Sequence, residues 1–276
     1  MPGQSFVKRV HKNGWRAVVF DRRTHGEEPY IEPLTPRTNN DCPPQYFNVY
    51  GDQRDMLRAI AEIGAIVPAA PLFVVGVSSG AVTLVRHLAE NGSASPFRAA
   101  VSFAGAVDIL KCQARVHWFF AIIFLARAKA YFVKRHMQAL LRVDKEGVLA
   151  CLRAKGLTEF LRGTAKMASH ATFDEYLRFT NPSAVDIEGG IKTPTLFVHA
   201  MDDMISTQRN IDDIRSVFDH NSNVALANSY TGGHCPFLEG AFALNPDNWG
   251  ERTTMEFFQA VLGAGERDLS EARSSE

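Results

Sequence analysis

Short apolar runs alternate with amphipathic segments along most of the chain. Each run is rich in β-branched or aromatic residues and is typical of a buried β-strand; the runs lie at 16–20, 72–76, 99–103, 193–200 and 224–227. Helical periodicity predicts helices at 5–12, 52–66, 81–91, 152–161, 208–218 and 249–262. Strands that alternate with helices predict the α/β class, with a doubly wound, mostly parallel sheet.

The domain organisation follows from where this alternation is interrupted. We expect one α/β domain over 1–264, with a helical cap insertion at about 109–182. Residues 24–44 are rich in Pro, Thr, Asn and Glu without periodicity, which predicts a long surface loop. The polar residues 265–276 predict a disordered tail.

Composition excludes several classes of protein. The 276 residues hold 30 basic and 30 acidic side chains, so nothing in the overall charge indicates a nucleic-acid partner. The four cysteines have no paired spacing, which predicts reduced thiols rather than disulfides or a zinc site. We expect no metal and no organic cofactor. No apolar run approaches membrane-spanning length, and a cytoplasmic protein is expected, with membrane association as the alternative.

The stretch from Pro71 to Val85 carries the most specific chemistry. A predicted strand ends at Gly76, the motif Gly-Val-Ser-Ser-Gly follows, and a helix then begins. In this context the motif predicts a nucleophile elbow, in which a sharp turn exposes the hydroxyl of Ser78 at a helix N-terminus. A Gly- and Ser-rich turn of this kind can also bind a phosphate or simply change the chain direction.

A serine nucleophile needs an imidazole base that a carboxylate orients, and two later strand ends supply these groups. Asp203 follows the strand at 193–200, and His234 follows Gly-Gly after the last strand. The order Ser78, Asp203, His234 is the order of an α/β-hydrolase triad. Asp202 is a rival for the acid, because one of the two neighbouring aspartates could cap a helix instead.

Three other residues have side chains of the right type for these roles. His199 lies within an apolar strand and is interpreted as a core histidine; Asp186 and Asp108 lie in loops that follow no strand.

The cap insertion has an unusual charge pattern. Between Ile109 and Val143 the chain has seven Lys or Arg residues and no Asp or Glu, with aromatic and aliphatic residues interleaved. One interpretation is a cap that packs its apolar face and solvates its charges. The other is a surface for peripheral contact with an anionic membrane through 109–143. The two interpretations are compatible.

The sequence resembles an α/β-hydrolase subfamily that includes the YheT esterases and the plant embryogenesis-associated proteins. The segments that carry the resemblance are Gly14-Trp15-Arg16-Ala17-Val18-Val19-Phe20, Pro33-Leu34-Thr35-Pro36-Arg37, Gly76-Val77-Ser78-Ser79-Gly80, Glu159-Phe160, His199-Ala200-Met201-Asp202-Asp203 and Gly232-Gly233-His234 with the residues to Gly240. The resemblance implies Ser78 as nucleophile, Asp203 as the orienting acid and His234 as base. It implies carboxylic esters as substrates, including acylglycerols or phospholipids.

The chain departs from this subfamily at its N-terminal side. Members carry a strand ending in His-Gly, upstream of the segment that matches 5–12, whose following loop supplies one of two oxyanion amides. We therefore expect an N-terminally truncated form of the fold, in which the Ser79 N–H is one oxyanion donor and the second has no candidate. Three functions remain open: a serine ester hydrolase, a catalytically impaired protein that acts by binding, and an acyltransferase.

Overall fold

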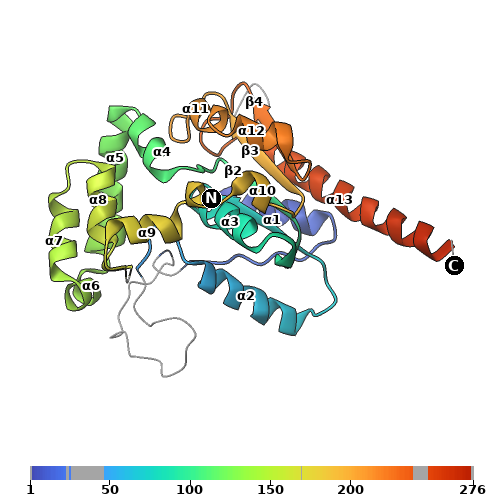
Figure 1. The fold of residues 1–276 in the computed structure, drawn as a ribbon, viewed down its shortest axis with the longest axis horizontal. Helices are drawn as coiled ribbons and strands as arrows, with labels where there is room; N and C mark the ends of the chain where they lie inside the picture. Colours follow the sequence, from blue (N-terminus) through green and yellow to red (C-terminus); the bar gives the residue numbers. More distant parts are fainter. Residues whose placement is uncertain (1, 23–24, 26–46, 169, 239–247, 275–276) are drawn as a thin grey trace. The chain divides into compact units, whose positions relative to one another are not determined.

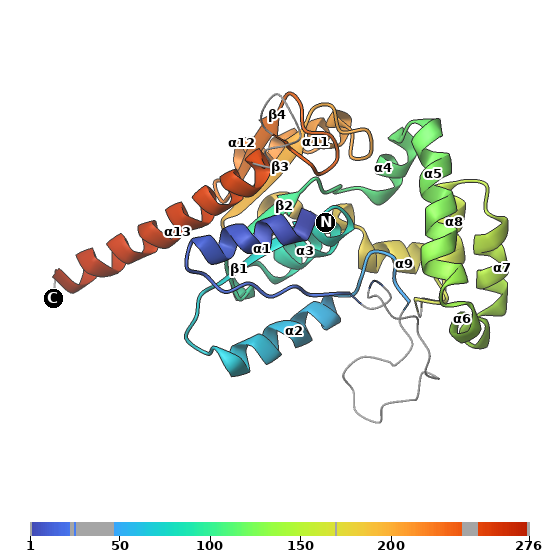
Figure 2. The same ribbon diagram turned by 180° about the vertical axis from the view of Figure 1, so that it is seen from behind.

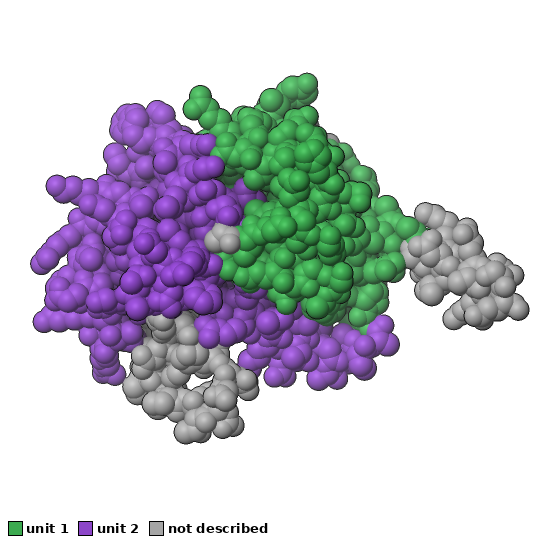
Figure 3. Space-filling model, in the orientation of Figure 1, with its two compact units in different colours: residues 1–19, 70–106, 185–276 green, residues 20–69, 107–184 purple. Residues whose placement is uncertain are grey.

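The computed structural model describes residues 2–22, 25, 47–168, 170–238 and 248–274. The chain divides into two compact units (Figure 3), and the expected single domain with a cap insertion stays a prediction. Unit 1 comprises Met1–Val19, Ala70–Ala106 and Val185–Glu276, and unit 2 comprises Phe20–Ala69 and Val107–Ala184. The second segment of unit 2 agrees within two residues with the predicted insertion at 109–182, but the earlier segment joins it.

Unit 1 is built on a four-stranded parallel sheet. Its strands follow one another in chain order and are β1 (Leu72–Val77), β2 (Phe97–Phe103), β3 (Thr195–Ala200) and β4 (Val224–Ser229). These are the four later apolar runs of the sequence. Their carboxyl ends lie at one edge, which is where open parallel sheets place functional residues.

Helices cover both faces of this sheet, as the doubly wound prediction requires. The helices of unit 1 are α1 (Pro2–Lys12), α3 (Ser79–Asn91), η1 (Gly92–Ala94), α10 (Ile187–Gly190), α11 (Gln208–Asp212), α12 (Arg215–His220) and α13 (Trp249–Ser274). Helices α3 and α10 cover the face of the sheet that is turned to the viewer in Figure 1. Helices α1 and α13 cover the other face, which is turned to the viewer in Figure 2. Alternate residues of β2 and β3 pack against Phe258 of α13 in the buried core.

The predicted strand at 16–20 is wrong. These residues have no regular secondary structure, and the side chains of Val18 and Val19 are 66% and 71% exposed. Apolar β-branched residues favour a strand only where a neighbouring strand completes the ladder. Among the described residues β1 pairs with β2 alone, so the segment at 16–20 has no such neighbour.

The region 265–276, for which a disordered tail is predicted, overlaps the end of α13. Helix α13 continues to Ser274, twelve residues beyond the predicted end at 262. The sequence of this extension contains Glu, Arg, Leu and Ala, which are among the best helix formers, and it has no Gly or Pro after Gly265. The low hydrophobicity of residues 265–276 predicts disorder, whereas their helix propensity and their continuity with the packed part of α13 favour a helix.

Unit 2 is helical. Its helices are α2 (Gln53–Ile66), α4 (Ile109–Arg115), α5 (Trp118–Ala128), η2 (Lys129–Lys134), α6 (Met137–Val143), α7 (Lys145–Arg153), α8 (Leu157–Thr164), α9 (Phe173–Thr180) and η3 (Pro182–Ala184). A buried cluster that includes Val133, Leu140 and Val148 holds the later helices together. Asp52 caps α2 by accepting from the Arg54 N–H, as predicted. The predicted loop at 24–44 lies, except for residue 25, outside the described residues.

None of the helices in the described part of the chain is both long enough and apolar enough to cross a bilayer.

Candidate active site

Ser78 lies in a sharp turn between β1 and α3. Its φ of 52° and ψ of −116° place it in a conformation that L-residues rarely adopt, and its N–H donates to the Phe103 carbonyl at 2.9 Å. The turn needs a glycine at position 76, because a Cβ there would lie 2.7 Å from the Gly80 carbonyl oxygen. The turn therefore has the geometry of the predicted elbow.

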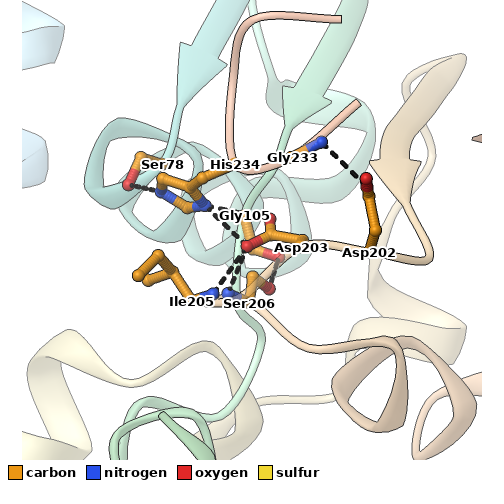
Figure 4. A network of polar contacts seen from close by, with 8 residues as sticks. All are labelled: Ser78, Gly105, Asp202, Asp203, Ile205, Ser206, Gly233 and His234. Carbon is orange, nitrogen blue, oxygen red and sulfur yellow. Dashed lines mark hydrogen bonds and ion pairs between the residues drawn. The ribbon is translucent and has the colours of Figure 1, made fainter. Parts of the chain in front are cut away.

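His234 reaches this turn from the segment that follows β4. Its Nε2 lies 2.8 Å from the Ser78 Oγ, a normal hydrogen-bond distance (Figure 4). The preceding residue, Gly233, has a φ of +58°, which glycine adopts without strain. Of the two glycines before His234, Gly233 therefore has a clear conformational role.

Asp203 lies on the other side of the imidazole. Its Oδ2 is 2.9 Å and its Oδ1 3.1 Å from the His234 Nδ1. The Asp203 side chain is fully buried, and its Oδ1 also accepts from the N–H groups of Ile205 at 2.7 Å and Ser206 at 2.9 Å. These donors replace the water that burial removes from the carboxylate.

Asp202 faces a different partner. Its Oδ1 accepts a hydrogen bond of 2.8 Å from the backbone N–H of Gly233 (Figure 4). The structure therefore brings Asp203, and not Asp202, to the imidazole, and it gives Asp202 a contact with the backbone beside His234.

The other three candidates, His199, Asp186 and Asp108, lie where they stabilise the fold and do not contact Ser78. His199 is 1% exposed within β3, and burial lowers the pKa of its imidazole below the usual value. The Asp186 carboxylate accepts from the Gly189 N–H at the start of α10. The Asp108 carboxylate accepts from the N–H groups of Leu110 and Lys111 at the start of α4. Both aspartates are helix caps.

Two supporting contacts were missed by the sequence analysis. The Asp202–Gly233 bond is one. The other is the bond of 3.0 Å from the Ser206 Oγ to the Gly105 carbonyl, which joins the turn after β3 to the segment after β2. Asp203 itself is a signal for an Asx-type turn, whereas Gly105, which accepts from the Ser206 Oγ, lies about a hundred positions away and could not have been found from the sequence.

The geometry permits a defined set of proton movements. With the Nδ1 proton held by Asp203, the Nε2 atom of His234 is the acceptor for the Ser78 hydroxyl proton. Ser79 is the first residue of α3, so its N–H lies at the positive end of that helix dipole. Within the described residues, His, Cys, Asp and Glu form no group of three that could hold a metal ion.

Known proteins with similar sequences include a member of the subfamily that the motifs indicate. The chain is 29% identical over 258 residues to the human protein named Phospholipase ABHD3, covering 91% of this chain and 58% of that protein. It is 23% identical over 270 residues to the Embryogenesis-associated protein EMB8 of Picea glauca, covering 93% of this chain and 55% of that protein. The chain thus spans a little over half the length of these relatives.

A solved structure supports the fold. The Pyrococcus furiosus esterase Pf2001 superposes with a TM-score of 0.53 at 16% identity, over 94% of this chain and 75% of that one. The family model Hydrolase_4, described as "Serine aminopeptidase, S33", matches residues 3–239. Since that match covers most of the chain, the protein belongs to the Hydrolase_4 family within the α/β-hydrolase superfamily.

Proposed function

We propose that the protein is a serine hydrolase that cleaves carboxylic esters, with Ser78, His234 and Asp203 as its catalytic triad. One observation carries the proposal: an unbroken series of contacts runs from the Ser78 Oγ to the His234 Nε2 at 2.8 Å and from the His234 Nδ1 to the Asp203 Oδ2 at 2.9 Å. Each distance is short enough for direct proton transfer or orientation.

The reaction proceeds in two halves. The Ser78 oxygen attacks the ester carbonyl while His234 Nε2 takes the hydroxyl proton, and the imidazolium then gives that proton to the departing alcohol. Water attacks the resulting acyl-serine, His234 accepts a proton from it, and the carboxylic acid leaves as Ser78 recovers its proton. Asp203 keeps the Nδ1 proton in place and stabilises the imidazolium without becoming protonated.

The Ser79 N–H is the oxyanion donor that we assign. It belongs to the residue after the nucleophile and to the first turn of α3, the usual position for such a donor.

We propose lipid esters as the substrate class. The support is the relative named a phospholipase, together with the resemblance to esterases. The family description names aminopeptidases, so an amide substrate is the direct competitor. Ester and amide hydrolysis share the triad and differ in the leaving group, so geometry alone does not rank them.

Labelling with a fluorophosphonate probe tests the nucleophile. We expect the chain to be labelled, Ser78→Ala to abolish labelling, and Ser79→Ala to retain it because the proposed donor is a backbone N–H. Labelling that survives Ser78→Ala would overturn the assignment. A folded wild-type sample that is not labelled would favour the impaired, binding-protein alternative.

The substrate class needs a second measurement. Hydrolysis of p-nitrophenyl esters and of a phospholipid is compared with hydrolysis of an aminoacyl p-nitroanilide, using Ser78→Ala as the blank. Esters are expected to be cleaved faster. A preference for the anilide would contradict the ester proposal, and transfer of the acyl group to an added alcohol in excess over water would identify an acyltransferase.

A further inference from the structure

Helix α5 of unit 2 exposes large apolar side chains along most of one side. Trp118 is 66%, Phe119 50%, Ile122 61% and Ile123 42% exposed. Residues three and four positions apart are neighbours on the surface of an α-helix; Phe119 is three positions before Ile122, and the pairs Trp118–Ile122 and Phe119–Ile123 are four apart, so these side chains form a continuous apolar face. A contiguous exposed patch of this kind usually marks an interaction site.

A second part of the α5 surface, beside this face, packs within unit 2. Leu125 and Ala128 contact the buried cluster that contains Val133 and Val148. Figure 2 shows α5 along the near side of α8, with which it is in contact. The helix is therefore apolar on both parts of its surface, and only one part is needed to hold unit 2 together.

The charged side chains of the segment that contains this face, residues 109–143, have one sign. No Asp or Glu occurs between Ile109 and Val143, whereas Arg127 and Lys134 are exposed at the C-terminal end of α5 and in η2. Lys129 is not part of this surface, because its Nζ donates to the Leu152 and Ala154 carbonyls at 2.9 and 2.6 Å. Arg135 lies over the Tyr131 ring, 5.2 Å from its centroid.

We propose that this face of α5 is a membrane-docking surface, in which Trp118, Phe119, Ile122 and Ile123 enter the interface of an anionic bilayer and Arg127 and Lys134 contact its headgroups. Apolar insertion combined with attraction between basic side chains and anionic lipids is the usual basis of peripheral binding. The docking surface does not depend on the proposed esterase function, since no triad residue belongs to α5.

The charge pattern favours a bilayer over a second copy of the chain. A symmetric dimer through this face would place the same surface on both partners, so the segment 109–143 of the second copy would bring more basic residues and no carboxylate to Arg127 and Lys134. Like charges at such an interface oppose association. An anionic bilayer instead supplies both the apolar environment and the opposite charge.

Co-sedimentation with vesicles tests the docking surface in the full chain. Phosphatidylcholine vesicles with and without phosphatidylserine are compared at 0.01 M and 1 M salt, where the Debye length falls from about 30 Å to about 3 Å. We expect binding to the phosphatidylserine vesicles at low salt, and much weaker binding at high salt or without phosphatidylserine. Ser78→Ala is expected to bind like the wild type, which separates docking from catalysis.

Matched variants assign the binding to α5. Ile122→Gln is expected to weaken binding about tenfold, and Arg127→Gln with Lys134→Gln about fivefold for each charge removed. Ile66→Gln and Arg58→Gln on α2 are the controls, because Ile66 and Arg58 are also exposed. Equal weakening by the controls, or none by the α5 variants, would overturn the proposal.

Tryptophan fluorescence gives an independent readout. Of the three tryptophans, Trp15 and Trp249 pack against the core of unit 1, whereas Trp118 is exposed. A blue shift on adding phosphatidylserine vesicles is expected, and Trp118→Phe should remove it. Binding without that shift contradicts insertion of this face. A dimer in solution that Ile122→Gln dissociates, without vesicle binding, would show that a second copy covers the face.

Discussion

The carboxylate of Asp202 holds the backbone N–H of Gly233 at 2.8 Å, one residue before the histidine that Asp203 contacts. The neighbouring residues Asp202 and Asp203 therefore bind the neighbouring residues Gly233 and His234. One positions the imidazole directly and the other fixes the chain that carries it. This division explains why an Asp-Asp pair is useful there, whereas the sequence alone left two rivals for one role.

The first prediction separates the two acids. Asp203→Asn should lower kcat on a reactive ester by about 10⁴ with little change in KM, because an amide cannot hold His234 in the productive tautomer. Asp202→Asn keeps an oxygen that can accept from Gly233 and should cost far less. The steady-state kinetics of both variants decide, and the reverse ranking would transfer the orienting role to Asp202.

The second prediction concerns the two glycines of the elbow motif. Gly76→Ala should destabilise the fold and reduce fluorophosphonate labelling, because its Cβ would lie 2.7 Å from the Gly80 carbonyl oxygen. Gly80→Ala is the matched control: a Cβ there meets nothing within 4 Å, and alanine in a helix is about 0.5–1 kcal/mol better than glycine. Urea midpoints are the measurement, and equal losses in both variants would refute the packing argument.

The third prediction is an acid sensitivity of stability. Burial lowers the pKa of His199 and of His87 in the folded protein, below the value of about 6.5 in an unfolded chain. The unfolded state therefore binds more protons at acidic pH, and stability falls as pH drops from about 6.5 towards the folded pKa values. The slope is at most about 1.4 kcal/mol per pH unit for each histidine.

Chemical denaturation at a series of pH values from 8 to 5 measures that slope. His199→Gln should flatten it even if the variant is less stable throughout, and His87→Gln should do the same. A slope that neither replacement changes would show that these histidines do not titrate with folding.

The fourth prediction concerns Cys235, the residue after His234. Burial raises the pKa of its thiol to about 12, with a further contribution from the negative charge of Asp203. Iodoacetamide at pH 8 should therefore modify Cys235 slowly in the folded protein and quickly after denaturation, since the thiolate is the reactive form. Mass spectrometry of the peptide that contains Cys235 gives the rates. Fast alkylation in the folded state would contradict the burial argument.

The sequence predicted the parts of this fold that depend on local pattern. Four strands and the helix after Ser78 follow from runs whose period and end signals agree, and Ser78, Asp203 and His234 could be selected because each follows a strand end. Their proximity in space was an inference from topology.

The sequence-based predictions failed where the structure depends on contacts between residues that are distant in the sequence. The apolar run at 16–20 has the composition of a strand, but no described strand pairs with it. The hydrogen bonds from Lys129 to the Leu152 and Ala154 carbonyls withdraw one of seven basic residues from the surface, which no count of charges could reveal. The Ser206–Gly105 bond joins residues about a hundred positions apart, beyond the reach of any local pattern.

The division into units has a consequence for biosynthesis. The chain crosses between the units four times, at 19/20, 69/70, 106/107 and 184/185, so neither unit is one continuous piece of sequence. Ser78 leaves the ribosome long before Asp203 and His234, because synthesis runs from the N-terminus. A nascent chain that ends within the second segment of unit 2, Val107–Ala184, would thus contain Ser78 but neither Asp203 nor His234. The three residues of the proposed triad are all present only once synthesis has passed residue 234.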